Sequence, residues 1–240
     1  MIECLIALGG NIGDVGDTFA AALGRLAAHP DIDISAVSRC FVTEPVGEDA
    51  GAPYLNAAAA LSTAMEPARL LETTKEIEIS LGRPADHATW APRSVDLDLV
   101  TFGDLVLEEE RLRVPHPGCW YRRFVLDPVC RIAGSTRHPA WQLTFDQLRE
   151  RLMARPLPVW LDMDDRRDRI AEWSGRFPEI EWVADPAAVE DCGLALPGNP
   201  RPPDPLVDVL TAATGSVELA EEIPGWPERK SPTDTSPGSC

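Results

Sequence analysis

The sequence predicts an α+β protein built on an antiparallel sheet with helices on one face, followed by a C-terminal extension. Apolar runs of strand and helix type follow one another in the order strand, helix, strand, strand, helix, strand over roughly the first hundred residues. That order is the ferredoxin-like βαββαβ arrangement, which would leave the other face of the sheet open for ligands. The extension is indicated by a change in composition near residue 156, because thirteen of the 23 prolines lie beyond residue 150.

A glycine-rich loop separates the first strand from the first helix. Ile2–Leu8 is a short apolar run of strand type, and Gly9–Asp14 is expected to be the loop that ends it. Asp17 or Thr18 is expected to cap the helix, in which apolar residues recur at helical spacing as far as Pro30. By itself the loop matches neither a dinucleotide fingerprint nor a P-loop, so it is weak evidence for a phosphate site.

Two further strands are expected, separated by a loop. The apolar residues within Ile32–Val37 indicate the second strand, whereas the glycine- and proline-containing stretch 43–53 is expected to be loop. The third strand is expected from Tyr54 to about Ser62, where the small residues Ala57–Ala60 leave room for something packed against them. An alanine run taken by itself would suit a helix equally well.

The second helix is expected over residues 67–82, between a proline start and a glycine stop. A strand over 94–102 follows, and the turn at 103–104 suggests that 105–107 returns beside it as a hairpin partner. The remaining expected elements are short helices at 117–133, 142–154 and 206–213, and segments 157–163, 166–175 and 180–184, which could form one βαβ unit.

Asp96 and Asp98 lie in a strand in which acidic and large apolar residues alternate. Side chains two apart on a strand share a face, so both carboxylates point one way while Leu97 and Leu99 point into the core. Carboxylates about 6 to 7 Å apart repel one another, and a divalent cation would balance them. Mg²⁺ suits such oxygen ligands and usually adds phosphate oxygens of a nucleotide. The alternative is an edge strand with a solvated acidic face.

The overall charge excludes some classes of partner. A net charge of −17 argues against nucleic acid or an anionic membrane as a partner, since both require basic patches.

We expect a cytoplasmic protein, because no stretch approaches the roughly 18 apolar residues of a membrane span and the N-terminus does not resemble a signal peptide. The six cysteines include no CxxC pair, so neither a zinc site nor a disulfide framework is indicated. Local positive charge for a phosphate comes from Arg83, Arg93, Arg111, Arg113, Arg122 and Arg123.

Five motifs, taken together in their order and spacing, resemble one family. They are Gly9–Gly13, Tyr54–Ala57, Leu81–Arg83, Trp90–Leu99 and Val114–Pro117. Over roughly residues 2–135 the sequence closely resembles the 6-hydroxymethyl-7,8-dihydropterin pyrophosphokinases of folate biosynthesis. The resemblance implies an enzyme that transfers pyrophosphate from ATP to the hydroxymethyl group of a reduced pterin, giving AMP and the pterin diphosphate.

The same resemblance implies roles for individual residues. Asp96 and Asp98 would hold two Mg²⁺ ions that bridge the ATP phosphates, and Arg83 and Arg93 would act with them in catalysis. The residues implied to bind ATP are Lys75, Glu78, Trp90, Arg93, Leu99, Arg111, His116 and Arg122. Those implied to hold the pterin are Thr43, Val46, Tyr54, Asn56 and Phe124. The expected partners are these small-molecule substrates, and the chain is expected to be a monomer.

One departure from the family concerns the loop after Arg83. Many members carry additional basic residues there, whereas the segment 84–89 of this chain has none except His87, so weaker ATP binding or slower turnover is expected. The alternative to an enzyme is a catalytically weak pterin- or nucleotide-binding module whose function lies in the C-terminal extension. The expected division is a pyrophosphokinase domain at 1–155, a small appendage at 156–221 and a disordered tail at 222–240.

Overall fold

A computed structural model of the chain describes residues 1–45, 52–82, 93–161, 166–185, 194–196, 206–220 and 226. Its main sheet has the strand order β11-β3-β4-β1-β5, β2 also pairs with β4, and all these pairs are antiparallel. The strands are β1 (Ile2–Gly10), β2 (Ile32–Val37), β3 (Phe41–Thr43), β4 (Tyr54–Thr63), β5 (Asp96–Phe102) and β11 (Val217–Leu219). The predicted α+β class and antiparallel sheet are confirmed.

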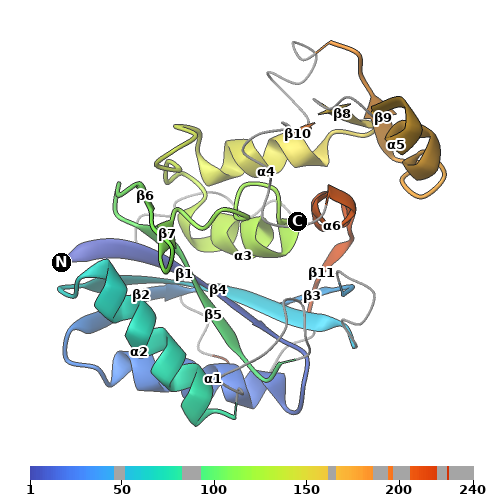
Figure 1. Ribbon diagram of the computed structural model, residues 1–240. Coiled ribbons are helices and arrows are strands. Elements are labelled where there is room, and N and C mark those ends of the chain that lie inside the picture. Colours follow the sequence, from blue (N-terminus) through green and yellow to red (C-terminus); the bar gives the residue numbers. More distant parts are fainter. Residues whose placement is uncertain are drawn as a thin grey trace.

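Two helices cover one face of this sheet. They are α1 (Val15–Ala27) and α2 (Pro67–Ser80), and both lie below the sheet in Figure 1. Ile6 and Leu8, at alternate positions of β1, are buried in one apolar cluster with Phe19 of α1 and Leu70 of α2. The period of two along the strand therefore places these side chains on the helix-covered face, as expected.

A third helix covers part of the opposite face. α3 (Arg123–Ala133) packs on that face against β4, and α4 (Phe145–Met153) packs on α3 (Figure 1). Ala58 and Ala60 of β4 are buried in the same cluster as Val125 and Val129 of α3. Methyl side chains let a helix approach the sheet closely, so α3 occupies part of the face that was expected to be open for ligands. The part of this sheet face that α3 leaves uncovered, beside its first residues, forms the site described below.

Two local expectations differ from the structure, and one strand was not expected. Asp14 caps α1, because its side chain accepts a hydrogen bond from the Asp17 amide (3.1 Å). Residues 105–107 do not return beside β5; instead β6 (Leu107–Glu108) pairs with β7 (Arg113–Val114) in a separate two-stranded sheet. The strand β3 was not predicted, since three residues are too few to show a period.

The C-terminal extension contains a small parallel sheet. Its elements are β8 (Leu157–Leu161), α5 (Arg166–Trp173), β9 (Ile180–Trp182), β10 (Leu194–Leu196) and α6 (Leu206–Thr214). The strand β8 pairs in parallel with β9 on one side and with β10 on the other. Within the described residues, no helix is both long enough and apolar enough to cross a membrane.

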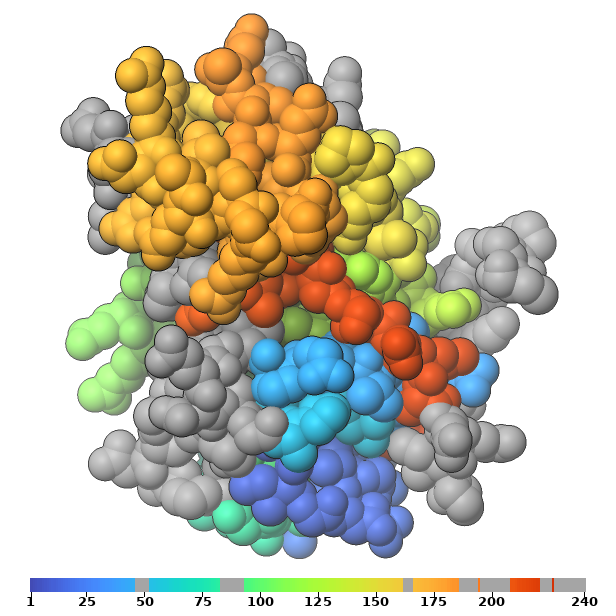
Figure 2. Space-filling view, turned by 90° about the vertical axis from the view of Figure 1, so that its right-hand side faces the viewer, coloured from blue at the N-terminus to red at the C-terminus, as the bar shows by residue number. Residues whose placement is uncertain are grey.

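The last described residues return to the main sheet. β11 pairs with β3, and in Figure 2 the segment 206–220 runs as a red band between the extension above and earlier parts of the chain below. An exposed strand edge offers unpaired backbone groups, and β11 satisfies those of β3. The domain division at residues 155 and 221 stays a prediction. Of the tail expected to be disordered, only Trp226 lies within the described residues.

Candidate active site

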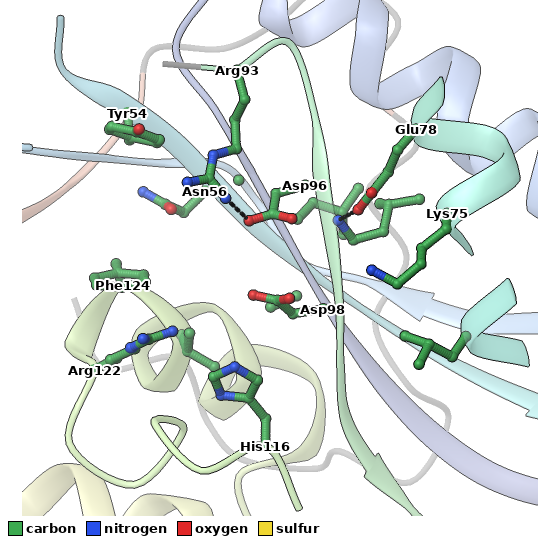
Figure 3. Close-up of a pocket in the computed structure, with 16 residues that line it drawn as sticks. Tyr54, Asn56, Lys75, Glu78, Arg93, Asp96, Asp98, His116, Arg122 and Phe124 are labelled. Carbon is green, nitrogen blue, oxygen red and sulfur yellow. Dashed lines mark hydrogen bonds and ion pairs between the residues drawn. The ribbon is translucent and has the colours of Figure 1, made fainter. Parts of the chain in front are cut away.

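A cavity of about 300 Å³ opens on the sheet beside the start of α3. It is lined by residues from β1, β4, β5, α2, α3 and the turn before α3 (Figure 3). Among its lining residues are ten that were predicted from the sequence: Tyr54, Asn56, Lys75, Glu78, Arg93, Asp96, Asp98, His116, Arg122 and Phe124. The fold thus brings together residues that are up to 70 positions apart in the chain.

Asp96 and Asp98 lie together on the cavity side of β5. The intervening Leu97 is buried on the opposite face, in the core formed with α1 and α2. On the neighbouring strand β1, Gly9 pairs with Asp96 and Ala7 pairs with Asp98. Directly paired residues of two strands share a face. Small partners at these two positions therefore leave space beside both carboxylates.

Arg93 forms an ion pair with Asp96, and both side chains are mostly buried. The backbone of Arg93 is held by the glycine-rich loop, because its carbonyl accepts from the Asn11 amide (2.9 Å) and its amide donates to Asn11 Oδ1 (3.0 Å). A Cβ at Gly10 would lie 2.5 Å from the carbonyl oxygen of Ser94. The loop therefore positions Arg93, a function that its sequence did not indicate.

Glu78 joins α2 to the strand that carries the two aspartates. Its side chain is 4% exposed, and Oε1 accepts a hydrogen bond from the Leu97 amide (2.6 Å). That amide lies between Asp96 and Asp98 in the chain. Glu78 also lines the cavity, with Lys75 one helical turn before it on α2. Glu78 therefore fixes the start of β5, and its expected contact with ATP stays a prediction.

The turn before α3 contributes His116. Its backbone amide donates to the carbonyl of Val100 on β5 (2.9 Å), and its ring Nδ1 accepts from the Gly118 amide (3.1 Å). A ring nitrogen that accepts carries no proton, so in the neutral ring the proton lies on Nε2. This arrangement leaves His116 with a donor nitrogen on a ring that lines the cavity.

Arg122 is buried beside two aromatic rings and a glycine. It is 9% exposed, and its Cζ lies 5.9 Å from the centre of the Tyr121 ring and 5.8 Å from that of Phe124. A Cβ at Gly118 would lie 2.5 Å from Arg122 Nε. Gly118 was missed by the sequence reasoning, although its place directly after a His-Pro pair is a turn signal.

Asn56 and Thr43 form a buried pair at the other end of the cavity. The Asn56 Nδ2 donates to Thr43 Oγ1 (2.9 Å), and both residues are buried. This bond fixes the orientation of the side-chain amide of Asn56, and Asn56 lines the cavity. Figure 3 shows Asn56 near Tyr54 and Phe124, on the side of the cavity away from Lys75. Thr43 thus acts on the cavity through Asn56.

Tyr54 lies close to the charged centre of the site. Burial raises the pKa of its hydroxyl above the usual value of 10, and Asp96 acts in the same direction, whereas Arg93 opposes the shift. The phenol is therefore neutral near pH 7 and can donate a hydrogen bond. Tyr54 thus combines a flat apolar ring with a polar tip beside the Arg93–Asp96 pair.

The remaining predicted residues are not placed at the cavity. Leu99 is buried in the core with α1 and α2, so its side chain points away from the site, as the alternation along β5 requires. Arg111 is exposed and does not line the cavity. Three predicted residues lie outside the described part of the chain: Val46, Arg83 and Trp90. The segment 84–89 also lies outside it.

Comparisons with solved structures find similar chains of larger size. A crystal structure of Plasmodium falciparum HPPK-DHPS with pteroate matches 75% of this chain at 11% identity, with a TM-score of 0.49. The wild-type protein with STZ-DHP matches 73% at 13% identity, with a TM-score of 0.47. This chain covers only 46% and 43% of those two chains.

Comparisons of sequence identify the family. The family described as 7,8-dihydro-6-hydroxymethylpterin-pyrophosphokinase (HPPK) matches residues 5–134. The 2-amino-4-hydroxy-6-hydroxymethyldihydropteridine pyrophosphokinase of Bacillus subtilis is 39% identical over 142 residues, which are 59% of this chain and 84% of that protein. The enzyme of the same name from Methylorubrum extorquens is 38% identical, over 55% of this chain and 84% of its own. The chain belongs to the 7,8-dihydro-6-hydroxymethylpterin-pyrophosphokinase family.

Proposed function

We propose that this chain transfers the pyrophosphoryl group of ATP to the hydroxymethyl group of 6-hydroxymethyl-7,8-dihydropterin, forming the pterin diphosphate and AMP. Membership of the family supports this reaction. The observation that carries the proposal is the pair of carboxylates, Asp96 and Asp98, at one cavity with the basic side chains of Lys75, Arg93 and Arg122. Such a set of charges suits a metal-bound polyphosphate.

The donor set fits magnesium that is shared with a substrate. Asp96 and Asp98 offer only oxygen ligands, and the described residues contain no group of three or more His, Cys, Asp or Glu side chains suited to a metal. Mg²⁺ is commonly held by one or two carboxylates together with phosphate oxygens and water. We therefore infer that these two residues, together with the phosphates of ATP, hold two Mg²⁺ ions. When bound, Mg²⁺ supplies charge neutralisation at the phosphate oxygens.

The polar residues around the cavity are suited to bind the polyphosphate. Arg122 is buried beside the Phe124 ring, His116 has its donor nitrogen at Nε2, and Lys75 lines the cavity from α2. Phosphoryl-type transfer leaves little covalent chemistry to the protein, so positioning and charge neutralisation dominate. Arg93, fixed through its backbone to Asn11, extends toward Asn56 and Asp96, on the side of the cavity opposite Arg122 and His116 (Figure 3).

The pterin is proposed to bind between Tyr54 and Phe124. Flat heteroaromatic rings pack well against aromatic side chains, and the oriented Asn56 amide can pair with the polar edge of a pterin. The hydroxymethyl oxygen would then face the Arg93–Asp96 pair, beside which we propose that the β-phosphorus lies. In the transfer this oxygen bonds to the β-phosphorus, its proton leaves, and the bond from the β-phosphorus to the oxygen of the AMP leaving group breaks.

Release of AMP distinguishes this reaction from simple binding. The purified chain is incubated with ATP, Mg²⁺ and 6-hydroxymethyl-7,8-dihydropterin, and AMP and the pterin diphosphate are separated and quantified. We expect equal amounts of the two products and none when EDTA removes the metal. AMP formation no higher than in the EDTA control would favour the alternative, a pterin- or nucleotide-binding module. The expected monomeric state and cytoplasmic location stay predictions.

A further inference from the structure

We propose that residues 206–220 together with Trp226, here called the brace, hold the two walls of the cavity between which the pterin is proposed to bind. The brace lies beyond residue 134, where the match to the family ends. This inference rests on the proposed function, because it assigns the brace a role in the binding of one of the two substrates. The brace residues act through others and are therefore positioning residues.

The first wall is held by β11. This strand pairs with β3 so that Val217 lies opposite Thr43 and Leu219 opposite Phe41. On its other side β3 pairs with β4, where Thr43 lies opposite Tyr54. The ladder continues beyond β11, because the Ala220 amide donates to the carbonyl of Cys40 (3.0 Å). Without β11, a strand of three residues would form the edge of the sheet directly beside Tyr54 and Asn56.

The second wall is held by the end of α6. Arg123, the first residue of α3, donates from Nη1 to the carbonyl of Gly215 (3.2 Å) and from Nη2 to Asp127 (2.9 Å). Arg123 lies between Arg122 and Phe124 in the chain, and both of these line the cavity. The helix α6 is also anchored by apolar packing, since Val209 and Leu210 are fully buried in the cluster of α3 and α4.

A third anchor fixes the far end of the brace. The Trp226 Nε1 donates to the carbonyl of Ser38 (2.8 Å), and its ring centre lies 6.2 Å from that of Phe19 on α1. Ser38 lies between β2 and β3, so this bond holds the chain just before β3 begins. The brace therefore contacts β3 itself, the residues just before β3, and the first residue of α3.

These contacts affect one end of the cavity more than the other. In the sheet order β11-β3-β4-β1-β5, the strand with Asp96 and Asp98 lies at the edge opposite the brace. Lys75 and Glu78 belong to α2, on the face of the sheet away from α6. Loosening the brace should therefore shift Asn56, Tyr54 and Phe124 more than the carboxylates. The expected result is a larger loss of pterin binding than of ATP binding, because Arg122, the residue before Arg123, is the one proposed ATP contact beside the brace.

Two matched pairs of variants in the full chain test this inference. Gly215→Ala places a Cβ 2.8 Å from the backbone carbonyl oxygen of Thr211, so the end of α6 must move, whereas Gly175→Ala meets nothing within 4 Å and serves as the control. Hydrogen-bonded pairs alternate along an antiparallel ladder. Because the Ala220 amide donates across this ladder, the amide of Glu218, two residues earlier, donates as well. Glu218→Pro removes that donor from β11. Glu218→Thr keeps that donor and suits a strand.

The readout is the KM for each substrate, measured with the other saturating, together with the melting temperature. We expect Gly215→Ala and Glu218→Pro to raise the KM for the pterin about tenfold and that for ATP less than about threefold, with both controls near wild type. Equal rises in both KM values, or an unchanged pterin KM in the folded Gly215→Ala variant, would overturn the inference. Absence of AMP formation by the wild-type chain would instead reject the proposed function, so the two failures are distinguishable.

Discussion

Replacing Gly118 by alanine should impair ATP use without unfolding the protein. An added Cβ would lie 2.5 Å from Nε and 2.7 Å from Cζ of Arg122. Ordinary contact begins at 3.4 Å, so the guanidinium must move by about 1 Å. The backbone at Gly118 is not in the left-handed region, and the atoms that would clash belong to a flexible side chain. The free energy of unfolding should therefore change by less than about 1 kcal/mol.

The cost to catalysis should be much larger than the cost to stability. A displacement of about 1 Å at a positioning group can lower the rate by about 100-fold, which corresponds to about 2.7 kcal/mol of transition-state stabilisation. The added methyl group would occupy space that the Arg122 guanidinium now fills, so the displaced side chain cannot return to its place. We therefore expect kcat/KM for ATP to fall by roughly 30- to 100-fold.

The assay is AMP formation at saturating pterin, compared among the wild type, Gly118→Ala, Arg122→Ala and the double variant. If the glycine acts through Arg122, adding Gly118→Ala to the Arg122→Ala variant should cause little further loss. Circular dichroism and thermal melting check that each variant is folded. A Gly118→Ala variant within about threefold of wild type, or an equal loss in both backgrounds, would refute this reasoning.

Three further predictions concern the metal pair, a close backbone contact and a buried histidine. Asp98→Asn should lower AMP formation by at least about 100-fold while the melting temperature holds or rises, because one of two like charges is removed; normal turnover would contradict this. Gly10→Ala should lower the free energy of unfolding in urea by about 2 kcal/mol, since its Cβ would lie 2.5 Å from the Ser94 carbonyl oxygen, whereas Gly9→Ala, with 3.6 Å to its nearest neighbour, should be nearly neutral. Burial lowers the pKa of His138 from 6.5 to about 4, so the unfolded chain takes up the proton first as the pH falls, and this residue should cost up to about 3 kcal/mol of stability between pH 6.5 and pH 4. Unfolding of His138→Asn should lack that part of the acid sensitivity, and identical pH slopes in the two proteins would contradict the assignment.

Local pattern was sufficient where a segment is long and periodic. The alternation in β5 predicted that Asp96 and Asp98 share a face, and the burial of Leu97 and Leu99 on the other face agrees. Pairing between strands was less predictable. The turn after β5 suggested a hairpin with residues 105–107, but Leu107 pairs with Val114 instead. Which strands pair depends on distant partners, and a turn signal alone does not specify them.

Contacts within the site were also predictable only between residues that are close in the chain. The residues of one motif, from Arg93 to Asp98, could be placed relative to one another because the chain between them is short and extended. The function of Glu78 could not, because its bond to the Leu97 amide spans 19 positions and joins a helix to a strand. Likewise nothing in the glycine-rich loop indicated that Asn11 would hold Arg93, 82 positions away.

The sequence by itself determined the class of fold, the order of its main elements and the face on which Asp96 and Asp98 lie. These properties depend on periodicity and on residues that are close in the chain, where geometry is set by the backbone. Only the tertiary structure decided that α3 covers part of the sheet, that Gly118 makes room for Arg122 and that the C-terminal strand β11 lies beside β3. Each of these depends on packing between distant segments, because shape and backbone pairing, not local pattern, select which surfaces meet.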